Sequence, residues 1–489
     1  MSKQYLAIDL GASGGRAVLG SIENNTLRMK EIHQFSNIPA TIGKHRYWDV
    51  LRLFLGIKNS MLKAQELGGF ESIAINGWGM DYGLLDQCGG ILRNPYQYRD
   101  IRTNGLCGVA EAFLPAKQSF ISTGIQQMEM NTLYQLFADW RNTPHLFENV
   151  DKLLMIPDLF NYMLIGVCKS ERSIASTTQF LDIHTGFWCP EQLAALGIPA
   201  TDILPPLVSA GTVLGELQPE LCEELGIPSA KVVAVCEHST QCAMVAVPTP
   251  KKDFIFLSCG TWALFGTELD HPIINEQARL LGMTNAIGYD GKISFLQNIS
   301  GMWLIQETKR WLAAHGETYS YAQLESFAVN AEPFVSFIDV DDPRFASAGN
   351  MPEMIRGYCA ETNQPIPRSI GALMRCIYES LALRFTRALS DIKACTGKEY
   401  LSIHMFDGGV KDKVLCQMTA NACGIPVVAG PAEATICGNL LVQLLADGIV
   451  DNLSEARNLV AHSSTLTVYQ PDADWSKAIA RYQQLTAKS

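Results

Sequence analysis

The residues best suited to binding a polyphosphate lie in a short turn near the start of the chain. An apolar run at 5–8 leads into Asp9, a turn of small residues follows at 11–15, and Arg16 precedes a second apolar run. Glycines let backbone N–H groups approach phosphate oxygens, and an arginine adds a fixed charged donor. Asp9 could also hold a hydrated Mg²⁺. A plain glycine-rich hairpin with an exposed aspartate has the same pattern, so both interpretations stay open.

Two further turns have this character. The apolar run 254–257 leads into the small residues 258–261, and Gly408 and Gly409 follow an apolar run at 401–406. None of the turns is the GxxxxGK[ST] phosphate loop or a GxGxxG that opens a helix. Each of these turns, taken alone, is as consistent with an ordinary turn as with a phosphate site. Together they favour a nucleotide bound in a cleft between two domains.

A third group of polar residues follows the apolar strand expected at 232–235. Glu237 and His238 carry side chains that can move protons, and Ser239 carries a hydroxyl that is a poor base near neutral pH. If the strand continues, Glu237 and Ser239 share a face, because side chains alternate along a strand. For His238, a ligand role and a buried core role are equally open.

The elements that would position these residues suggest a duplicated α/β chain. The hairpins expected at 5–20 and 254–266 are similar and stand about 250 residues apart, so we expect two α/β domains of similar core topology. A linker-like segment with two prolines at 246–252 places the division, which gives domains 1–245 and 246–489. Helices are expected at 50–67, 130–141, 369–395, 411–423 and 437–447, and strands at 71–76, 232–235, 401–406 and 425–428.

Composition limits the classes of function. The chain has 489 residues, 18% of them charged, and a net charge of −11, which disfavours nucleic acid or an anionic membrane as the main partner. No apolar run is long enough to span a membrane, and the N-terminus meets a charge too early for a secretion signal. The fourteen cysteines lack a CxxC pair and fit reduced thiols in a cytoplasm. The oligomeric state is not indicated.

The turns and several longer segments resemble the FGGY family of carbohydrate kinases. The resemblance extends over essentially the whole chain. It implies the two-domain actin/hexokinase-like (ribonuclease H-like) duplicated α/β fold with an interdomain cleft, with ATP and Mg²⁺ as cofactors. It further implies transfer of phosphate to the C1 hydroxyl of a 6-deoxy-ketohexose such as L-rhamnulose. The matching segments are 9–16, 78–82, 98–103, 131–136, 260–262, 298–304 and 429–434.

Site residues follow from this resemblance position by position. The sugar site falls on Gly79, His238, Thr240 and Asn298. Trp78 could cover an apolar sugar face, although core packing is the more ordinary role of a tryptophan. The nucleotide site falls on Ala12, Ser13, Gly14, Gly15, Arg16, Thr261, Gln306 and Gly409, with Gly408 beside it.

The departures from the family pattern bear on catalysis. Ser239 stands where the family has the aspartate that takes the proton from the sugar, and Asn76 stands where the family has another acidic residue. Asp407 replaces the first glycine of a triple-glycine turn and puts a negative charge near the expected adenosine site. Glu237 and Asp81 are candidate substitute bases.

Two classes of function are therefore expected to compete. The first is an ATP-dependent carbohydrate kinase with weakened or relocated base chemistry. The second is a catalytically weak or inactive kinase-fold protein that binds a sugar, a nucleotide or a protein partner as a sensor or regulator. An unrelated chaperone or filament protein with the same fold is disfavoured by the segments 78–82 and 98–103.

Overall fold

The computed structural model describes residues 3–199, 202–249 and 251–487. Residue 250, in the predicted linker, lies outside them. The chain forms two compact units, each with strands and helices, which confirms the α/β class; the boundary between 245 and 246 stays a prediction. The first unit comprises 1–250, 269–295 and 434–463, and the second comprises 251–268, 296–433 and 464–489.

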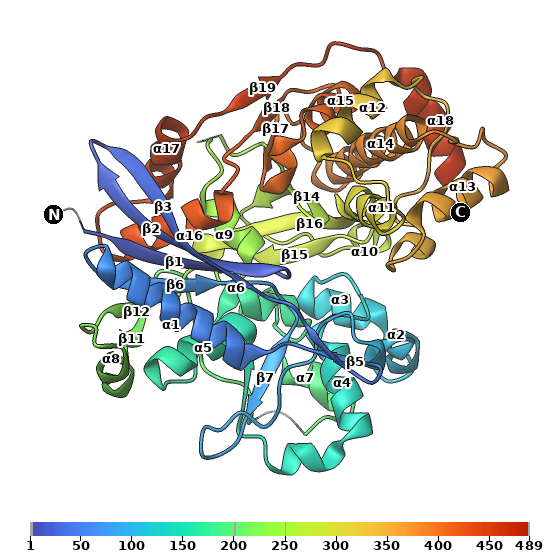
Figure 1. The fold of residues 1–489 in the computed structure, drawn as a ribbon. Coiled ribbons are helices and arrows are strands. Elements are labelled where there is room, and N and C mark those ends of the chain that lie inside the picture. Colours follow the sequence, from blue (N-terminus) through green and yellow to red (C-terminus); the bar gives the residue numbers. More distant parts are fainter. Residues whose placement is uncertain (1–2, 200–201, 250, 488–489) are drawn as a thin grey trace. The chain divides into compact units, whose positions relative to one another are not determined.

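The sheet of the first unit places β1 between β2 and β6 (Figure 1). Its strand order is β11-β12-β6-β1-β2-β3. Strand β1 runs antiparallel to β2 and parallel to β6, with Asp9 opposite Arg16 on one side and Asn76 on the other. The strands are β1 (Tyr5–Leu10), β2 (Gly14–Glu23), β3 (Thr26–Ser36), β6 (Ser72–Asn76), β11 (Val213–Glu216) and β12 (Lys231–Val233).

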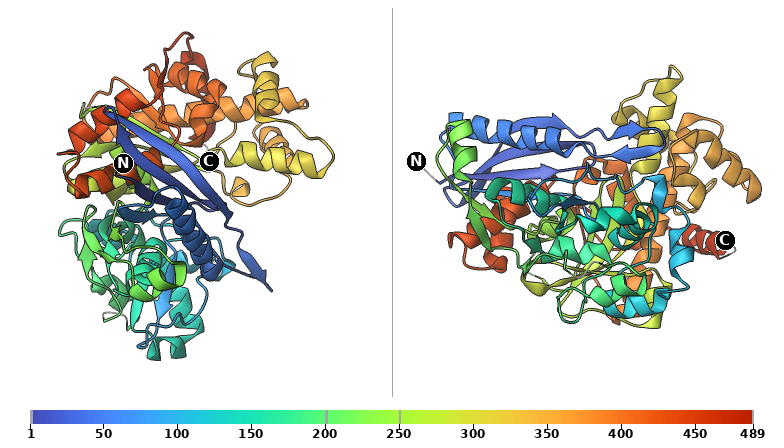
Figure 2. Two further views of the ribbon diagram at one scale, coloured as in Figure 1. Left: turned by 60° about the vertical axis from the view of Figure 1, so that its left-hand side comes forward. Right: turned by 90° about the horizontal axis from the view of Figure 1, so that it is seen from below.

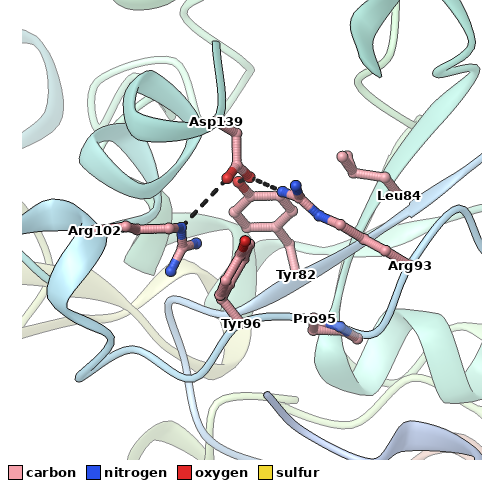
Figure 3. Close-up of a pocket in the computed structure, with 7 residues that line it drawn as sticks. All are labelled: Tyr82, Leu84, Arg93, Pro95, Tyr96, Arg102 and Asp139. Carbon is pink, nitrogen blue, oxygen red and sulfur yellow. Dashed lines mark hydrogen bonds and ion pairs between the residues drawn. The ribbon is translucent and has the colours of Figure 1, made fainter. Parts of the chain in front are cut away.

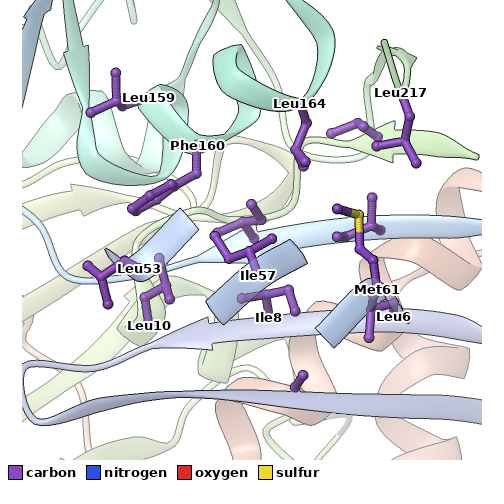
Figure 4. Packing of buried hydrophobic residues seen from close by; sticks show 14 of the residues in the cluster. Leu6, Ile8, Leu10, Leu53, Ile57, Met61, Leu159, Phe160, Leu164 and Leu217 are labelled. Atoms are coloured by element: carbon purple, nitrogen blue, oxygen red, sulfur yellow. The ribbon is translucent and has the colours of Figure 1, made fainter. Parts of the chain in front are cut away.

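Alternating apolar residues of β1 form the core of this unit with helix α1 (Val50–Glu66), which confirms the helix expected at 50–67. Figure 4 shows Leu6, Ile8 and Leu10 facing Leu53 and Ile57 of α1. The side-chain period of two in the strand and of about 3.6 in the helix produces these matching apolar faces. The hairpin β2–β3 lies along α1 (Figure 2). Helix α5 (Ile156–Ile165) adds to this core.

Two more helices pack in the first unit near the strand ends. Helix α9 (Ser239–Val245) begins at Ser239, and α16 (Ala434–Ala446) packs against it and against β1. Gly438 is required at their contact, because a Cβ there would lie 1.8 Å from the carbonyl oxygen of Cys242. A segment distant in sequence thus packs behind the first strands.

The second sheet repeats the same core order. In it β13 pairs antiparallel with β14 and parallel with β17, which pairs parallel with β18. In the first unit β1 pairs likewise with β2 and β6, and β6 pairs parallel with β12, so the expected similarity of core topology is confirmed. The sheet order is β15 (Thr284–Ile287), β16 (Ile293–Ser300), β14 (Trp262–Leu269), β13 (Ile255–Cys259), β17 (Ile403–Phe406), β18 (Val427–Ala429) and β19 (Thr467–Tyr469).

The remaining elements agree with the predicted helices and refine their ends. The helix expected at 437–447 begins three residues earlier, and the strand expected at 232–235 ends at Val233. Within the described residues, no disulfide joins the cysteines and no helix could cross a membrane. Further helices are α2 (Leu106–Ala110), α3 (Ala116–Thr123), α4 (Thr132–Asn142), α6 (Arg172–Ala175), α7 (Pro190–Ala195), α8 (Pro219–Leu225), α10 (Glu276–Leu280), α11 (Trp303–Ala314), α12 (Tyr321–Asn330), α13 (Met351–Glu361), α14 (Ile370–Thr396), α15 (Lys413–Cys423), α17 (Leu453–Ser463) and α18 (Ser476–Thr486). Short strands are β4 (Ala40–Ile42), β5 (His45–Tyr47), β7 (Tyr82–Leu85), β8 (Lys152–Met155), β9 (Ser170–Glu171) and β10 (Leu207–Val208).

Candidate active site

The turn between β1 and β2 presents its tip to solvent. The N–H of Gly11 donates to the carbonyl oxygen of Gly14 at 2.9 Å, and the side-chain amide of Asn37 donates to the carbonyl oxygen of Gly11 at 2.8 Å. Ala12 and Ser13 are exposed. The tip is therefore held in shape by hydrogen bonds while its outer residues stay open to a ligand.

Asp9 lies at the end of β1 with both carboxylate oxygens engaged. Arg16 donates to Oδ2 at 3.0 Å, and the Asn76 amide donates to Oδ1 at 2.7 Å. The described residues contain no cluster of three His, Cys, Asp or Glu side chains that could hold a metal. Mg²⁺ usually keeps several waters and binds one or two carboxylates plus substrate phosphates. Asp9 fits a hydrated ion that arrives with a nucleotide, and it does not fit a dedicated protein site.

Ser239 is held by the backbone just beyond β6. Its backbone N–H and its hydroxyl donate to the carbonyl oxygen of Gly77 at 2.9 and 2.8 Å. Its Oγ accepts the Asn76 amide at 3.2 Å. No described carboxylate or imidazole side chain hydrogen-bonds to Ser239. The hydroxyl proton is already donated to a carbonyl, so nothing in this arrangement makes Ser239 a stronger base.

A chain of buried amides, not predicted from the sequence, lies behind Asn76. Asn439 of α16 donates to Asn76 Oδ1 at 2.8 Å, and Gln443 donates to Asn439 Oδ1 at 2.7 Å. Ser72 in turn donates to Gln443 Oε1 at 2.6 Å. Each group therefore points its donor toward the site, which fixes the Asn76 amide nitrogen toward Asp9 and Ser239. The sequence signal was two polar residues, four apart, in an apolar helix.

Glu237 does not share a face with Ser239, which corrects the expectation from strand alternation. The strand has ended at Val233, and α9 begins at Ser239. The Glu237 carboxyl is buried and accepts from Asn161 of α5 at 2.7 Å. Burial and the neighbouring Asp158 raise the pKa of Glu237 well above its ordinary value. Glu237 thus contacts α5, and its role as a substitute base stays an untested prediction.

Asp81 is buried and fully hydrogen-bonded. Its Oδ2 accepts the indole N–H groups of Trp48 and Trp78 at 2.6 and 3.0 Å, and its Oδ1 accepts Gln135 at 2.9 Å. Burial raises the pKa of Asp81 to about 6, although the hydrogen bonds oppose this shift. The carboxylate therefore orients the two tryptophans, and its role as a base also stays a prediction.

The turn that holds Gly79 is tightly constrained. A Cβ on Gly79 would lie 2.8 Å from a methyl carbon of Thr177. Met80 has φ of +77°, and its N–H donates to the Thr177 hydroxyl at 3.1 Å. Its carbonyl oxygen accepts the Thr132 hydroxyl at 2.7 Å. A left-handed conformation is uncommon for methionine, and such strain often occurs at ligand sites.

Tyr82, which follows this turn in the chain, lines a small polar pocket (Figure 3). Arg93 and Arg102 both line it and converge there on Asp139. Both guanidinium groups also stack on the ring of Tyr96, at 4.8 and 4.0 Å. Arg102 donates to Gln135 at 2.8 Å, and Gln135 contacts Asp81. The pocket thus belongs to the network that supports the 78–81 turn.

The remaining predicted sugar residues fall in two places. His238 caps the start of α9, and its N–H donates to the Ser173 hydroxyl at 3.2 Å. Burial lowers the pKa of His238 to about 4, so its ring is neutral near pH 7, and its buried Nδ1 has no partner among the described residues. Thr240 is buried in α9. Asn298 lies on β16, in the part that belongs to the second unit.

The predicted nucleotide residues of the second unit converge around the β13–β14 turn. The Thr261 hydroxyl donates to Gln306 at 3.2 Å, and the Met302 N–H donates to the Gly260 carbonyl oxygen at 2.8 Å. A Cβ on Gly409 would lie 2.5 Å from the Cβ of Cys259, so only glycine fits there. The structure thus brings together Thr261 with Gln306, and Gly408 and Gly409 with the end of β13.

Asp407 introduces a charge and strain beside these glycines. Its φ of +67° and ψ of −159° fall in a region that is essentially limited to glycine. Its Oδ2 accepts the Ser258 hydroxyl at 2.5 Å. The residue therefore keeps the backbone shape of a glycine turn at an energetic cost.

Comparison with known proteins defines the class. Residues 4–246 match the N-terminal domain and residues 255–446 the C-terminal domain of the FGGY family of carbohydrate kinases. The chain belongs to this family and is a sugar kinase by descent. It is 39% identical over 490 residues to a rhamnulokinase of Bacteroides thetaiotaomicron, covering 99% of both chains. It is 38% identical over 488 residues to a rhamnulokinase of Bacillus subtilis, again covering 99% of each.

Solved structures confirm the two-domain kinase fold. The gluconate kinase of Lactobacillus acidophilus superposes with a TM-score of 0.81 at 18% identity, over 100% of this chain and 97% of that one. The ligand-bound xylulose kinase of the same organism superposes with a TM-score of 0.79 at 18% identity, over 99% of this chain and 96% of that one. At this identity the likeness concerns the fold alone.

Proposed function

We propose that this protein is an ATP-dependent kinase that phosphorylates the C1 hydroxyl of a 6-deoxy-ketohexose such as L-rhamnulose, with slow chemistry. Full-length relatives named rhamnulokinase, at 39% and 38% identity, support the substrate class. ATP with Mg²⁺ is the proposed phosphate donor, and the cytoplasm is the proposed compartment. The observation that carries the slow chemistry is the Asn76–Ser239 pair.

In this proposal the two sets of turns hold the nucleotide phosphates. Ala12 to Arg16 supply backbone donors and a guanidinium from the first unit, and Thr261, Gln306 and Gly408–Gly409 act from the second. Small residues at strand ends let N–H groups reach phosphate oxygens. Bound Mg²⁺ would neutralise charge that develops on the phosphates, with Asp9 as its nearest protein ligand.

The sugar is proposed to lie against Gly79, His238, Thr240 and Asn298. His238 is neutral, so one of its ring nitrogens can accept a hydrogen bond from a sugar hydroxyl. Ser239 lies next to it and would face the reacting hydroxyl. Losing a general base typically lowers a rate by about 10²–10⁴-fold, whereas positioning and electrostatics carry much of phosphoryl transfer. A residual rate is therefore expected.

A second candidate is a binding protein without useful kinase activity. Two contacts favour this candidate. Asn76 and Ser239 are both neutral and contact each other. Asp9, the nearby carboxylate, is paired with Arg16. Such a protein would bind sugar or nucleotide as a sensor. The two candidates differ in turnover, which one assay can measure.

The test is a coupled ADP-release assay with L-rhamnulose, L-fuculose, L-ribulose and D-xylulose, beside thermal-shift titrations with each sugar and ATP. Wild type should turn over slowly, and Ser239→Asp should raise the rate by about 10²-fold or more. The Asn76 amide lies within reach of the new carboxylate and would hold it. Ser239→Asn is the matched control. Asparagine has the size of aspartate but no carboxylate, so this variant should remain slow.

Two further outcomes bear on the candidates. A wild-type rate in the usual kinase range of about 1–100 s⁻¹ would show that Ser239 does not replace a needed base. Glu237 and Asp81 would then be the next residues to mutate. If Ser239→Asp stays inert although sugar and ATP still bind, the binding-protein candidate is supported.

A further inference from the structure

Three carboxyl groups gather in the interior of the first unit, directly behind the His238–Ser239 segment. Asp158 belongs to α5, Glu171 caps the start of α6, and Glu237 precedes α9. They are 2%, 2% and 1% exposed. None of the lysines and arginines that the structure describes forms an ion pair with any of the three. A buried charge without a partner is costly, so such a group usually keeps a proton.

The three carboxyls differ in how their oxygens are hydrogen-bonded, and all the bonds that Glu171 accepts fall on its Oε2. Asp158 accepts the Ser170 hydroxyl at 2.6 Å and the Glu171 N–H at 2.9 Å. Glu171 accepts the N–H groups of Ser173 and Glu237 at 2.9 and 3.0 Å. Glu237 accepts only from Asn161, at 2.7 Å through Oε1, and its buried Oε2 has no partner among the described residues.

A proton on Glu237 explains this pattern. It turns Oε2 from an unsatisfied acceptor into a donor toward Asp158, and it removes one of three neighbouring negative charges. Burial is the largest cause that raises the pKa values of the cluster, and the neighbouring carboxyls add to it for Glu171 and Glu237. The pKa of Asp158 rises to about 6 and that of Glu171 to about 7. The pKa of Glu237 rises further still.

The cluster holds the backbone of the segment that leads into α9. The Glu237 N–H donates to Glu171 at 3.0 Å. The next N–H, that of His238, donates to the Ser173 hydroxyl at 3.2 Å, and this hydroxyl is itself bonded to Glu171. The following residue is Ser239. Two successive peptide groups therefore depend on where Glu171 lies.

We propose that Asp158, Glu171 and Glu237 are positioning residues for His238 and Ser239, and that they act as a carboxyl cluster that must retain a proton. When the pH rises and the cluster loses its shared proton, mutual repulsion displaces Glu171 and releases the two peptide groups. The cluster thereby couples pH to the shape of the sugar site. This consequence rests on the proposed function, whereas the release of the backbone does not.

Other titratable groups pack around the cluster and do not supply a positive charge. From the same segment come Cys236 and His238, and α9 contributes Cys242. Tyr289 lies next to Cys236. His238 is neutral in this setting because burial lowers its pKa to about 4. Arg172, at the start of α6, stacks on Phe187. These thiols and the phenol are neutral near pH 7 and add no compensating charge.

The test compares backbone amide hydrogen exchange of residues 237–239 in wild type and Glu237→Gln, at pH 5.5 and pH 8.5, without sugar or nucleotide. Glutamine has the shape of a protonated glutamate and cannot ionise. The two proteins should exchange equally at pH 5.5. At pH 8.5 the wild type should exchange faster by about tenfold or more, since each unit of pKa shift changes the open population about tenfold.

Glu224→Gln is the matched control, because Glu224 is an exposed glutamate paired with Lys58. It should follow the wild type at both pH values. The proposal is overturned if wild type and Glu237→Gln exchange equally at pH 8.5, or if Glu237→Gln exchanges faster at pH 5.5. It is equally overturned if Glu237→Gln does not fold, because the neutral form would then not be the native one. A missing kinase activity would refute the proposed function and leave this result unaffected.

Discussion

At the scale of single residues, neutral side chains and one strained acid distinguish this chain. Asn76 and Ser239 contact each other, so a change at one alters the surroundings of the other. Asp407 has the opposite character, because it adds a carboxylate where the backbone favours glycine. These three positions should be tested in combination as well as singly.

Replacing Asp407 by glycine should remove backbone strain. Strain in this region costs about 1–3 kcal/mol, and the lost bond from Ser258 offsets about 1 kcal/mol. Asp407→Gly should therefore be more stable than Asp407→Ala by about 1–3 kcal/mol, since alanine keeps the strain and also lacks the bond. Urea unfolding measures both. Equal stability of the two variants would show that the turn relaxes around a Cβ.

Asp407→Gly should also tighten ATP binding in a thermal-shift titration, because it removes a negative charge.

At the scale of elements, the contact between α9 and α16 sets the site. Helix α9 starts with Ser239, and α16 supplies Asn439, which orients Asn76. Gly438 allows the two helices to touch, because its missing side chain leaves room for the Cys242 carbonyl group. The position of the site residues therefore depends on a glycine that touches no substrate.

Gly438→Ala should destabilise the protein by about 3 kcal/mol, because the new Cβ would meet a backbone oxygen that cannot rotate away. The matched control is Gly108→Ala in α2, where a Cβ meets nothing within 4 Å. That variant should be unchanged or more stable by up to about 1 kcal/mol, as alanine favours helix. Urea unfolding separates the two. A Gly438→Ala protein as stable as the control would refute the close contact.

At the scale of the whole molecule, buried carboxyls should make stability fall as pH rises. Burial raises the pKa of Asp81 and Asp158 to about 6 and that of Glu171 to about 7. Below about pH 4 these groups are protonated in both the folded and the unfolded chain. Above that, the unfolded chain ionises first, so their contribution to stability is lost as the pH rises toward 6–7.

The free energy of unfolding should thus be lower at pH 8 than at pH 5, by about 5 kcal/mol. Urea unfolding at intervals between these values measures it. Asp81→Asn should lower stability overall, since the amide nitrogen would face N–H donors, and it should also reduce the slope with pH. Asp202→Asn, at an exposed position, should leave the slope unchanged. A stability that stays level or increases toward pH 8 would contradict the buried protonated carboxyls.

Much of this organisation could be predicted from the sequence. The apolar runs before small-residue turns predicted both hairpins, and apolar periodicity predicted α1, α4, α14 and α15 to within about two residues at most ends. These signals are local, because period and turn chemistry act over a few residues. The resemblance to carbohydrate kinases was equally readable from segments such as 78–82.

Other features depend on residues far apart in the chain. Alternation along a strand placed Glu237 beside Ser239, but the strand ended and a helix began, so the carboxyl faces α5 and joins Asp158 and Glu171. Asn439 reaches Asn76 across more than 360 residues. The sequence by itself determined which small-residue turns can meet a phosphate and which acids are replaced. Only the tertiary structure decided which carboxyls are buried together, because burial and the resulting pKa shifts depend on the packing of elements that no local pattern specifies.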